Sequence, residues 1–217
     1  MIRALIFDFD GLILETELPY YQSVRELYQQ YQCEVPPELF QGIGSADLFD
    51  PYEYLARQLG HPVDRQRLSQ ERRQRHFELV TANPVLPGVP DYLKEAKRMG
   101  LRVGLASSSS REWVTGHLSR VGLLSFFEVI RCADDVTRTK PDPELFRAVL
   151  TAFQLEPDQA LVFEDSLNGV SAARQAGTFC VAVPSHLTRQ FDFSQAHLRL
   201  NSLADLPLRE LLVRIQG

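Results

Sequence analysis

Short apolar runs, without strict alternation of apolar and polar residues, recur along the chain. Runs of this kind are typical of strands that are buried on both faces, as in a parallel sheet. The first run stops abruptly at Asp8, where the chain turns acidic. We predict strands at 2–7, 101–106, 129–132, 160–163 and 178–183.

Between these runs, apolar residues recur at helical spacing. One helix is predicted at 89–99, and the next begins near Ser109, which has capping-box spacing with Glu112. Further helices are predicted to begin at 142–143, where a proline occupies the first position, and to cover 167–176. Strands and helices that alternate in this way predict an α/β fold with a doubly wound parallel sheet and right-handed crossovers.

One long stretch interrupts the alternation of strands and helices. From 15 to 85 there is no strand-like run, and helical patterns are found at 18–31, 47–59 and 64–81. Prolines and a glycine at 84–88 indicate the return to the core. We therefore predict an all-helical cap domain at 15–85, inserted into an α/β core made of 1–14 and 86–217.

Composition narrows the range of partners. The formal net charge of −5 argues against a protein that binds nucleic acid through long-range attraction to phosphates. The arginines within 64–77 are mixed with acidic and amide residues, so we interpret that segment as a solvated helix face. We expect a monomer that binds neither nucleic acid nor membranes.

Three further features of the sequence predict the cellular compartment of the protein. The three cysteines form no C-x-x-C pair, and Cys132 and Cys180 lie in apolar runs, as expected for buried thiols in a reducing compartment. The first strand-like run follows the N-terminal methionine without a basic leader. No segment is apolar for long enough to cross a bilayer. We expect a cytoplasmic protein.

Two aspartates follow the first predicted strand, and they are the clearest chemical signal. The carboxyl ends of parallel strands form the edge where ligands bind in open α/β sheets. Asp8 and Asp10 are two residues apart, so in extended backbone both side chains would face one pocket. A divalent cation would offset the repulsion between two such carboxylates. Taken alone, the motif is equally consistent with a structural turn at Gly11.

Polar residues also follow the second and fourth predicted strands. Ser107 and Ser108 would lie at a helix N-terminus, where a phosphate can bind, although helix capping alone explains serines there. Lys140 precedes a predicted helix and is either a phosphate-neutralising cation or a surface residue. Glu164 and Asp165 are typical metal ligands. Together these residues predict one rim that holds a phosphate and a metal ion.

These motifs occur in a familiar order. The segments DFDGLILETE, LASSS, KPDPELF and FEDSLNG succeed one another, with the helical insertion after the first. In this respect the chain resembles the haloacid dehalogenase-like hydrolase superfamily, in the helical-cap subgroup of phosphatases and β-phosphoglucomutase-like proteins. The resemblance covers nearly the whole chain and implies a Rossmann-like core with an inserted cap.

The resemblance implies a role for each matching residue. Asp8 would attack phosphorus and form an aspartyl-phosphate, and Asp10 would protonate the leaving alkoxide and then activate water. Ser107 and the backbone N–H of Ser108 would bind the transferring phosphoryl group, while Lys140 would balance its charge.

The implied cofactor is Mg2+. Its expected ligands are Asp8, the backbone carbonyl of Asp10 and Asp165, with Glu164 bound directly or through water. The acid at position 10 favours phosphate esters, because dehalogenase and phosphonatase members need no acid there.

Departures from the family pattern bear on the substrate. Glu15 replaces the aspartate that many relatives carry after the first motif. Tyr20 and Ser45 stand where β-phosphoglucomutase-like members have a histidine and an arginine, which favours hydrolysis over mutase chemistry. The segment 42–49 is expected to select the substrate. Because it has no basic residues, we do not expect it to bind a second phosphate group of the substrate.

We therefore predict a phosphatase that acts on small phosphorylated metabolites, such as sugar phosphates. Two alternatives remain on the same scaffold. One is a β-phosphoglucomutase-like phosphomutase, and the other is a non-catalytic module that binds a phosphorylated metabolite.

Overall fold

A single parallel sheet organises the protein. The computed structural model describes residues 1–36 and 50–216. Its sheet has six strands in the order β3-β2-β1-β4-β5-β6, and every neighbouring pair is parallel. The strands are β1 (Ala4–Phe7), β2 (Arg102–Ala106), β3 (Val129–Arg131), β4 (Ala160–Glu164), β5 (Phe179–Ala182) and β6 (Leu198–Arg199). The first five confirm the predicted strands, whereas β6 was not predicted because a two-residue strand leaves no hydrophobic pattern.

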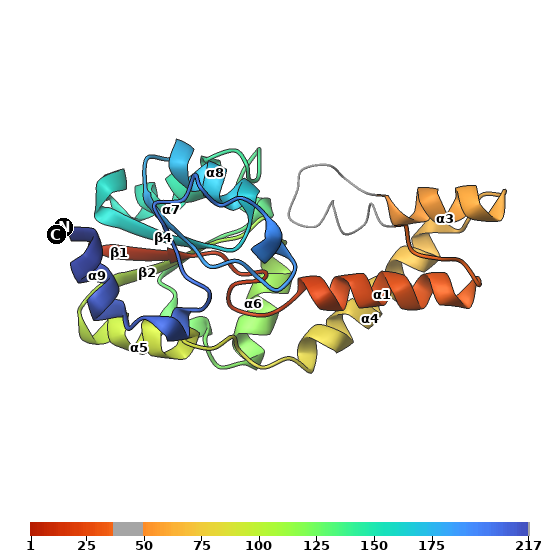
Figure 1. The fold of residues 1–217 in the computed structure, drawn as a ribbon, viewed down its shortest axis with the longest axis horizontal. Coiled ribbons are helices and arrows are strands. Elements are labelled where there is room, and N and C mark those ends of the chain that lie inside the picture. Colours follow the sequence, from red (N-terminus) through yellow and green to blue (C-terminus); the bar gives the residue numbers. More distant parts are fainter. Residues whose placement is uncertain (37–49, 217) are drawn as a thin grey trace.

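Helices cover both faces of this sheet (Figure 1). The helices of the core are α5 (Val89–Arg98), α6 (Arg111–Arg120), α7 (Glu144–Phe153), α8 (Leu167–Gln175) and α9 (Leu208–Gln216). Along β1, Leu5 and Phe7 pack toward α5 and α9, whereas Ala4 and Ile6 pack toward α7 and α8. All four side chains are fully buried, which explains why the strand is continuously apolar.

The start of α6 differs from the predicted capping box. Ser110, not Ser109, is the N-cap, and its hydroxyl accepts a hydrogen bond from the backbone N–H of Trp113 at 3.3 Å. The run of four serines offers several capping residues one position apart, so the motif alone does not fix the register. The shift frees the Ser109 side chain to contact Asp10.

Among the described residues, three helices form a separate group beyond the carboxyl end of the sheet: α1 (Glu17–Gln30), α3 (Pro51–Leu59) and α4 (Arg65–Thr81) (Figure 1). Leu27, Leu55 and Leu68, one from each helix, meet in a small core. Asp50 caps α3, so this helix begins inside the predicted segment 47–59, of which 47–49 lie outside the described residues.

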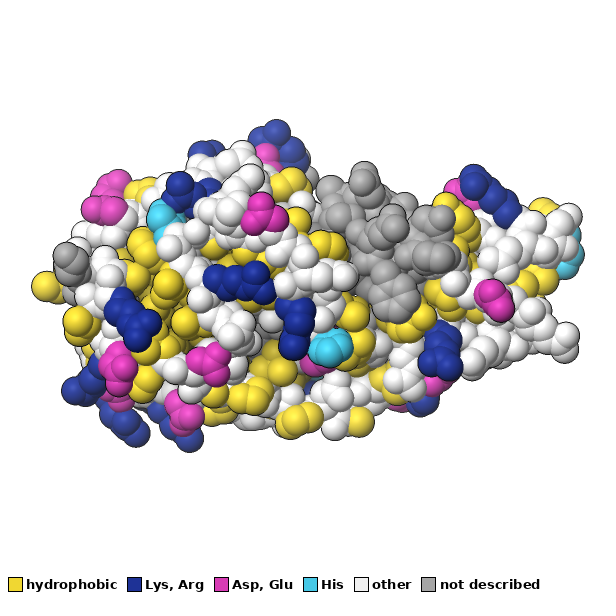
Figure 2. All heavy atoms as spheres, viewed as in Figure 1, with side chains coloured by type: hydrophobic (Ala, Val, Ile, Leu, Met, Phe, Trp, Pro, Cys, Tyr) yellow, Lys and Arg dark blue, Asp and Glu magenta, His cyan; other side chains and the backbone are white. Residues whose placement is uncertain are grey.

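Ion pairs join α4 to α1 and to the start of α3. Arg65 pairs with Asp50, and Arg75 pairs with Glu26 at 2.6 Å. These pairs fit the solvated helix face that was predicted for 64–77. Figure 2 shows acidic and basic side chains interspersed over the visible face of the molecule. No helix among the described residues is long and apolar enough to span a membrane.

An aromatic cluster joins α4 to α6. His117 is fully buried, and neither ring nitrogen has a hydrogen-bond partner among the described residues. Its ring lies 4.3 Å from that of Trp113 and 5.0 Å from that of Phe77, between centroids. Burial, with a smaller contribution from Arg120, lowers the pKa of His117 from 6.5 to about 4.

Because the pKa of His117 is lowered in the folded protein, we predict that the stability of the protein depends on pH. Between about pH 6.5 and 4 the unfolded chain binds the proton more readily, so the free energy of unfolding should fall as pH decreases through that window. The His117→Leu variant should lose this dependence, which amounts to roughly 2–3 kcal/mol. Urea unfolding at pH 7 and pH 4.5 measures it, with exposed His61→Gln as the control. An unchanged slope in His117→Leu would contradict the assignment.

Candidate active site

The ends of three adjacent strands bring the predicted site residues together. β1 pairs with β2 on one side and with β4 on the other, in matching register. Asp8 follows β1, Ser107 follows β2, and Glu164 is the last residue of β4. Parallel strands end at the same edge, so residues more than 150 positions apart in the chain become neighbours.

Lys140 lies at the centre of this edge. Its side chain is only 5% exposed, and its ammonium group donates to Asp8 Oδ1, to Glu164 Oε1 at 2.5 Å and to the Ala106 carbonyl at 2.7 Å. Burial alone would lower the pKa of Lys140, but the carboxylates of Asp8 and Glu164 outweigh it and raise the pKa above its ordinary value. Lys140 is therefore a fixed buried cation and not a surface residue.

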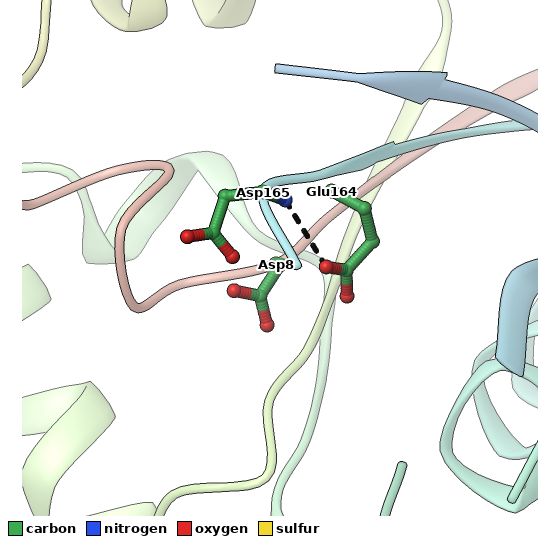
Figure 3. Close-up of side chains that lie close together, drawn as sticks. All are labelled: Asp8, Glu164 and Asp165. Carbon is green, nitrogen blue, oxygen red and sulfur yellow. Dashed lines mark hydrogen bonds between the residues drawn. The ribbon is translucent and has the colours of Figure 1, made fainter. Parts of the chain in front are cut away.

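Three carboxyl groups gather beside this lysine. Ligand atoms of Asp8, Glu164 and Asp165 lie within 4.8 Å of one another. Figure 3 shows the Asp8 and Asp165 carboxyl groups side by side, with Glu164 accepting from the Asp165 N–H at 3.1 Å. Glu164 Oε2 also accepts from the N–H and the hydroxyl of Ser166. Both oxygens of Glu164 are thus engaged, and Asp8 is bound through Oδ1 to Lys140, whereas Asp165 Oδ2 accepts no hydrogen bond from the described residues.

The carboxyl groups of the cluster are costly to ionise without a cation. Burial, followed by repulsion from Glu164 and Asp10, raises the pKa of Asp8 to about 8 despite its contact with Lys140. Burial and repulsion from Glu17 and Asp8 raise the pKa of Asp165 well above its usual range. One ammonium group does not neutralise three carboxylates.

The cluster suits a hard divalent cation. Asp165 Oδ2 is buried and has no hydrogen-bond partner among the described residues. Gly11 keeps space beside it, because a Cβ there would lie 2.1 Å from that oxygen. Oxygen-only donors, an orphaned carboxylate oxygen and excess negative charge fit Mg2+.

Gly169 is required by the same cluster. A Cβ at this position, near the start of α8, would lie 1.8 Å from the Glu164 carboxyl carbon. We expect Gly169→Ala to lower the free energy of unfolding by about 1–3 kcal/mol, because the carboxyl group that anchors Lys140 must move.

The matched control for this substitution is Gly116→Ala on α6. Nothing lies within 4 Å of a Cβ at Gly116. This variant should be neutral or gain up to about 1 kcal/mol, because alanine is the better helix former. Urea unfolding compares the two, and equal effects would contradict the proposed constraint at Gly169.

Asp10 has different partners from Asp8. Its Oδ2 accepts from the hydroxyls of Ser109 at 2.6 Å and Ser107 at 3.3 Å, and its Oδ1 accepts from the Trp113 indole N–H at 3.0 Å. Ser108 is exposed at the bend that leads into α6. Sequence reasoning missed Trp113, although it is the only tryptophan of the chain and lies one turn into the helix after the serine run.

The connection from β1 to α1 also borders the site. Glu15 directly precedes Thr16, the N-cap of α1, and its Oε1 accepts from the Glu17 N–H at 3.0 Å and from the Leu18 N–H at 3.2 Å. The longer acid at position 15 thus satisfies two N–H groups of the first turn. Glu17 Oε2 is buried without a partner among the described residues. Burial and repulsion from Asp10 raise the pKa of Glu17 to about 8.

The predicted substrate-selecting residues are only partly described. Tyr20 lines the same open pocket as Asp10, and the Arg72 guanidinium lies 4.7 Å from the centroid of its ring. Ser45 and the segment 42–49 lie outside the described residues.

Comparisons with known proteins show which family this chain is similar to. The family model "Haloacid dehalogenase-like hydrolase" matches residues 5–183. "Putative phosphatase YhcW" of Bacillus subtilis is 44% identical over 213 residues, covering 98% of this chain and 97% of that protein. "Phosphorylated carbohydrates phosphatase" of Thermotoga maritima is 30% identical over 180 residues, covering 81% of this chain and 82% of that protein.

A solved structure is similar over the full length. The crystal structure of CbbY from Rhodobacter sphaeroides in complex with phosphate has a TM-score of 0.78 and 30% identity. The match covers 97% of this chain and 99% of that chain. These matches confirm the predicted resemblance, the predicted fold class and the predicted enzyme class, a hydrolase. The chain belongs to the haloacid dehalogenase-like hydrolase family.

Proposed function

We propose that this protein is a Mg2+-dependent phosphatase that hydrolyses small phosphate monoesters through an aspartyl-phosphate on Asp8. One observation carries the proposal. The Asp8 carboxylate contacts the buried ammonium group of Lys140 and lies beside two further acids at the edge of the sheet. Asp10, by contrast, accepts hydrogen bonds from neutral donors. The first arrangement suits nucleophilic attack on a phosphate, and the second suits proton transfer.

In the first step, an Asp8 carboxylate oxygen attacks phosphorus. The P–O bond to the organic group breaks, and Asp10 gives its proton to the departing alkoxide oxygen. The Ser107 hydroxyl and the Ser108 N–H bind the phosphoryl oxygens, and Lys140 stabilises the negative charge shared with Asp8.

In the second step, water attacks phosphorus of the aspartyl-phosphate. Asp10, now a carboxylate, takes the proton from that water, and the bond between phosphorus and the Asp8 oxygen breaks. Inorganic phosphate leaves, and both aspartates return to their starting forms. The two roles of Asp10 require a side chain that can exchange a proton without being tied to Lys140.

Mg2+ would be held by Asp8, Asp165 and the Asp10 carbonyl oxygen. It would neutralise charge on the transferring phosphoryl group. Glu164 already accepts from Lys140, Asp165 and Ser166, so we assign it contact with the ion through water.

We further propose that 15–85 forms a cap over this site and that the substrate is a phosphorylated carbohydrate or a metabolite of similar size. The helices α1 and α4 contribute Tyr20 and Arg72 to the pocket that contains Asp10. The relative from Thermotoga maritima is named for phosphorylated carbohydrates, which supports this substrate class.

Phosphate release from a panel of sugar phosphates and other small monoesters tests the proposal. Release should require Mg2+ and should stop on addition of a chelator. Mg2+ alone should raise the free energy of unfolding by about 2.7 kcal/mol at a hundredfold excess over its Kd. Asp165→Asn should weaken this stabilisation.

Product analysis separates the alternatives. An isomerised sugar phosphate, formed with a bisphosphate primer, would favour the mutase. Binding of phosphorylated ligands without turnover would favour the non-catalytic module. Either result would overturn the proposed phosphatase.

A further inference from the structure

The proton-transfer carboxylate is held in one orientation by an indole. Trp113 Nε1 donates to Asp10 Oδ1 at 3.0 Å, and the hydroxyls of Ser109 and Ser107 approach Oδ2. An indole N–H can only donate, whereas a serine hydroxyl can donate or accept. The indole therefore fixes the orientation of the Asp10 carboxyl group at one oxygen, while the serine hydroxyls contact the other.

The indole is in turn held by α4. The His76 ring stacks on the Trp113 ring at a centroid distance of 4.8 Å and an interplanar angle of 29°. Phe77, also from α4, meets the same indole edge-on. His76 lies 37 positions before Trp113 in the chain, and only the packing of α4 against α6 brings the two rings together.

His76 has a fixed orientation of its own. Its Nε2 lies 2.9 Å from the carbonyl oxygen of Thr16, so this nitrogen carries the hydrogen and donates. Thr16 directly precedes α1, in the segment that connects Asp10 to that helix. Burial, with a smaller contribution from Arg72, lowers the pKa of His76, which keeps the stacked ring neutral at neutral pH.

We propose that Trp113 is a positioning residue for Asp10, and that His76 holds the Trp113 indole so that the Asp10 carboxyl group keeps the orientation in which it transfers a proton to the leaving oxygen. The inference rests on the proposed phosphatase function. It assigns to α4 a part in the first chemical step, beyond covering the pocket.

Leaving groups of different basicity test this role. An alkyl phosphate such as glycerol phosphate needs a proton on its leaving oxygen, whereas para-nitrophenyl phosphate expels a stable anion. The ratio kcat/KM covers the steps up to formation of the aspartyl-phosphate. Trp113→Phe keeps an aromatic ring and removes the donor. It should lower kcat/KM roughly 10- to 100-fold on the alkyl ester, the range for a lost hydrogen bond to a charged group, and less than about threefold on the aryl ester.

His76→Phe is the second variant, because it keeps a ring for stacking and loses the hydrogen bond to Thr16. It should shift the ratio of kcat/KM values between the two substrates in the same direction, by a smaller factor. This variant still tests the proposal if Trp113→Phe does not fold. His197→Phe is the matched control, because the His197 ring also stacks on an aromatic ring, that of Phe179, at 4.2 Å between centroids. Phe179 begins β5, at the edge of the sheet opposite to the site, so this variant should leave the substrate ratio unchanged.

Two results would overturn the inference. An equal loss on both substrates would assign Trp113 a merely structural role. A rise in KM on the alkyl ester alone, with kcat unchanged, would mean that Trp113 binds the substrate and does not position Asp10. Wild-type protein that releases no phosphate from either ester would instead overturn the proposed function itself.

Discussion

Replacement of Asp8 by asparagine is expected to abolish phosphate release. An amide oxygen is a poor nucleophile and cannot form the aspartyl-phosphate, so the loss should reach roughly three powers of ten or more. The fold should persist, because the substitution conserves shape and removes one of three crowded acids. Single-turnover phosphate release, with circular dichroism of both proteins, measures the two effects.

The control for this variant is Asp91→Asn. Asp91 is exposed in the first turn of α5, outside the site, and its loss should leave turnover unchanged. Turnover in Asp8→Asn within tenfold of wild type would contradict a covalent route through this residue.

Loss of the Lys140 charge is expected to have the largest effect on stability. In Lys140→Met a side chain of similar length leaves Asp8 and Glu164 buried without their counter-ion. Breaking a buried pair in this way typically costs about 3–5 kcal/mol. Added Mg2+ should restore part of the loss, because it brings positive charge to the same carboxylates. Urea unfolding at neutral pH, with and without Mg2+, measures both effects.

Arg209→Met provides the comparison for a surface ion pair. The Arg209 side chain, which pairs with Glu95, is 70% exposed. Exposed pairs are worth at most about 1 kcal/mol, because water screens them and the side chains lose freedom. Equal destabilisation in the two variants would show that Lys140 does not stabilise the cluster.

Local patterns predicted the positions of the main strands and the edge where the site forms. Buried parallel strands are continuously apolar, and the first and fourth predicted runs end where the candidate site residues Asp8 and Glu164 begin. Because parallel strands all end at one edge, the order of motifs was enough to group these residues before any contact was known.

Details within the motifs could not be predicted in the same way. The four serines after β2 permit two cap positions, and only the backbone of the folded bend assigns the cap to Ser110 and leaves Ser109 to Asp10. The charge pattern of α4 predicted a solvated face correctly, but not that His76 turns inward onto Trp113.

The sequence by itself determined where the main strands of the core lie and that helices follow the first strand, and it predicted the acids, serines and lysine that form the candidate site. These features depend on local hydrophobicity and on motifs within a few residues. Only the tertiary structure decided that Lys140 bridges Asp8 and Glu164, and that Trp113 and His76 reach Asp10 from two helices. Such contacts join residues tens to more than a hundred positions apart. They depend on how helices pack against each other, which leaves no periodic trace in the chain.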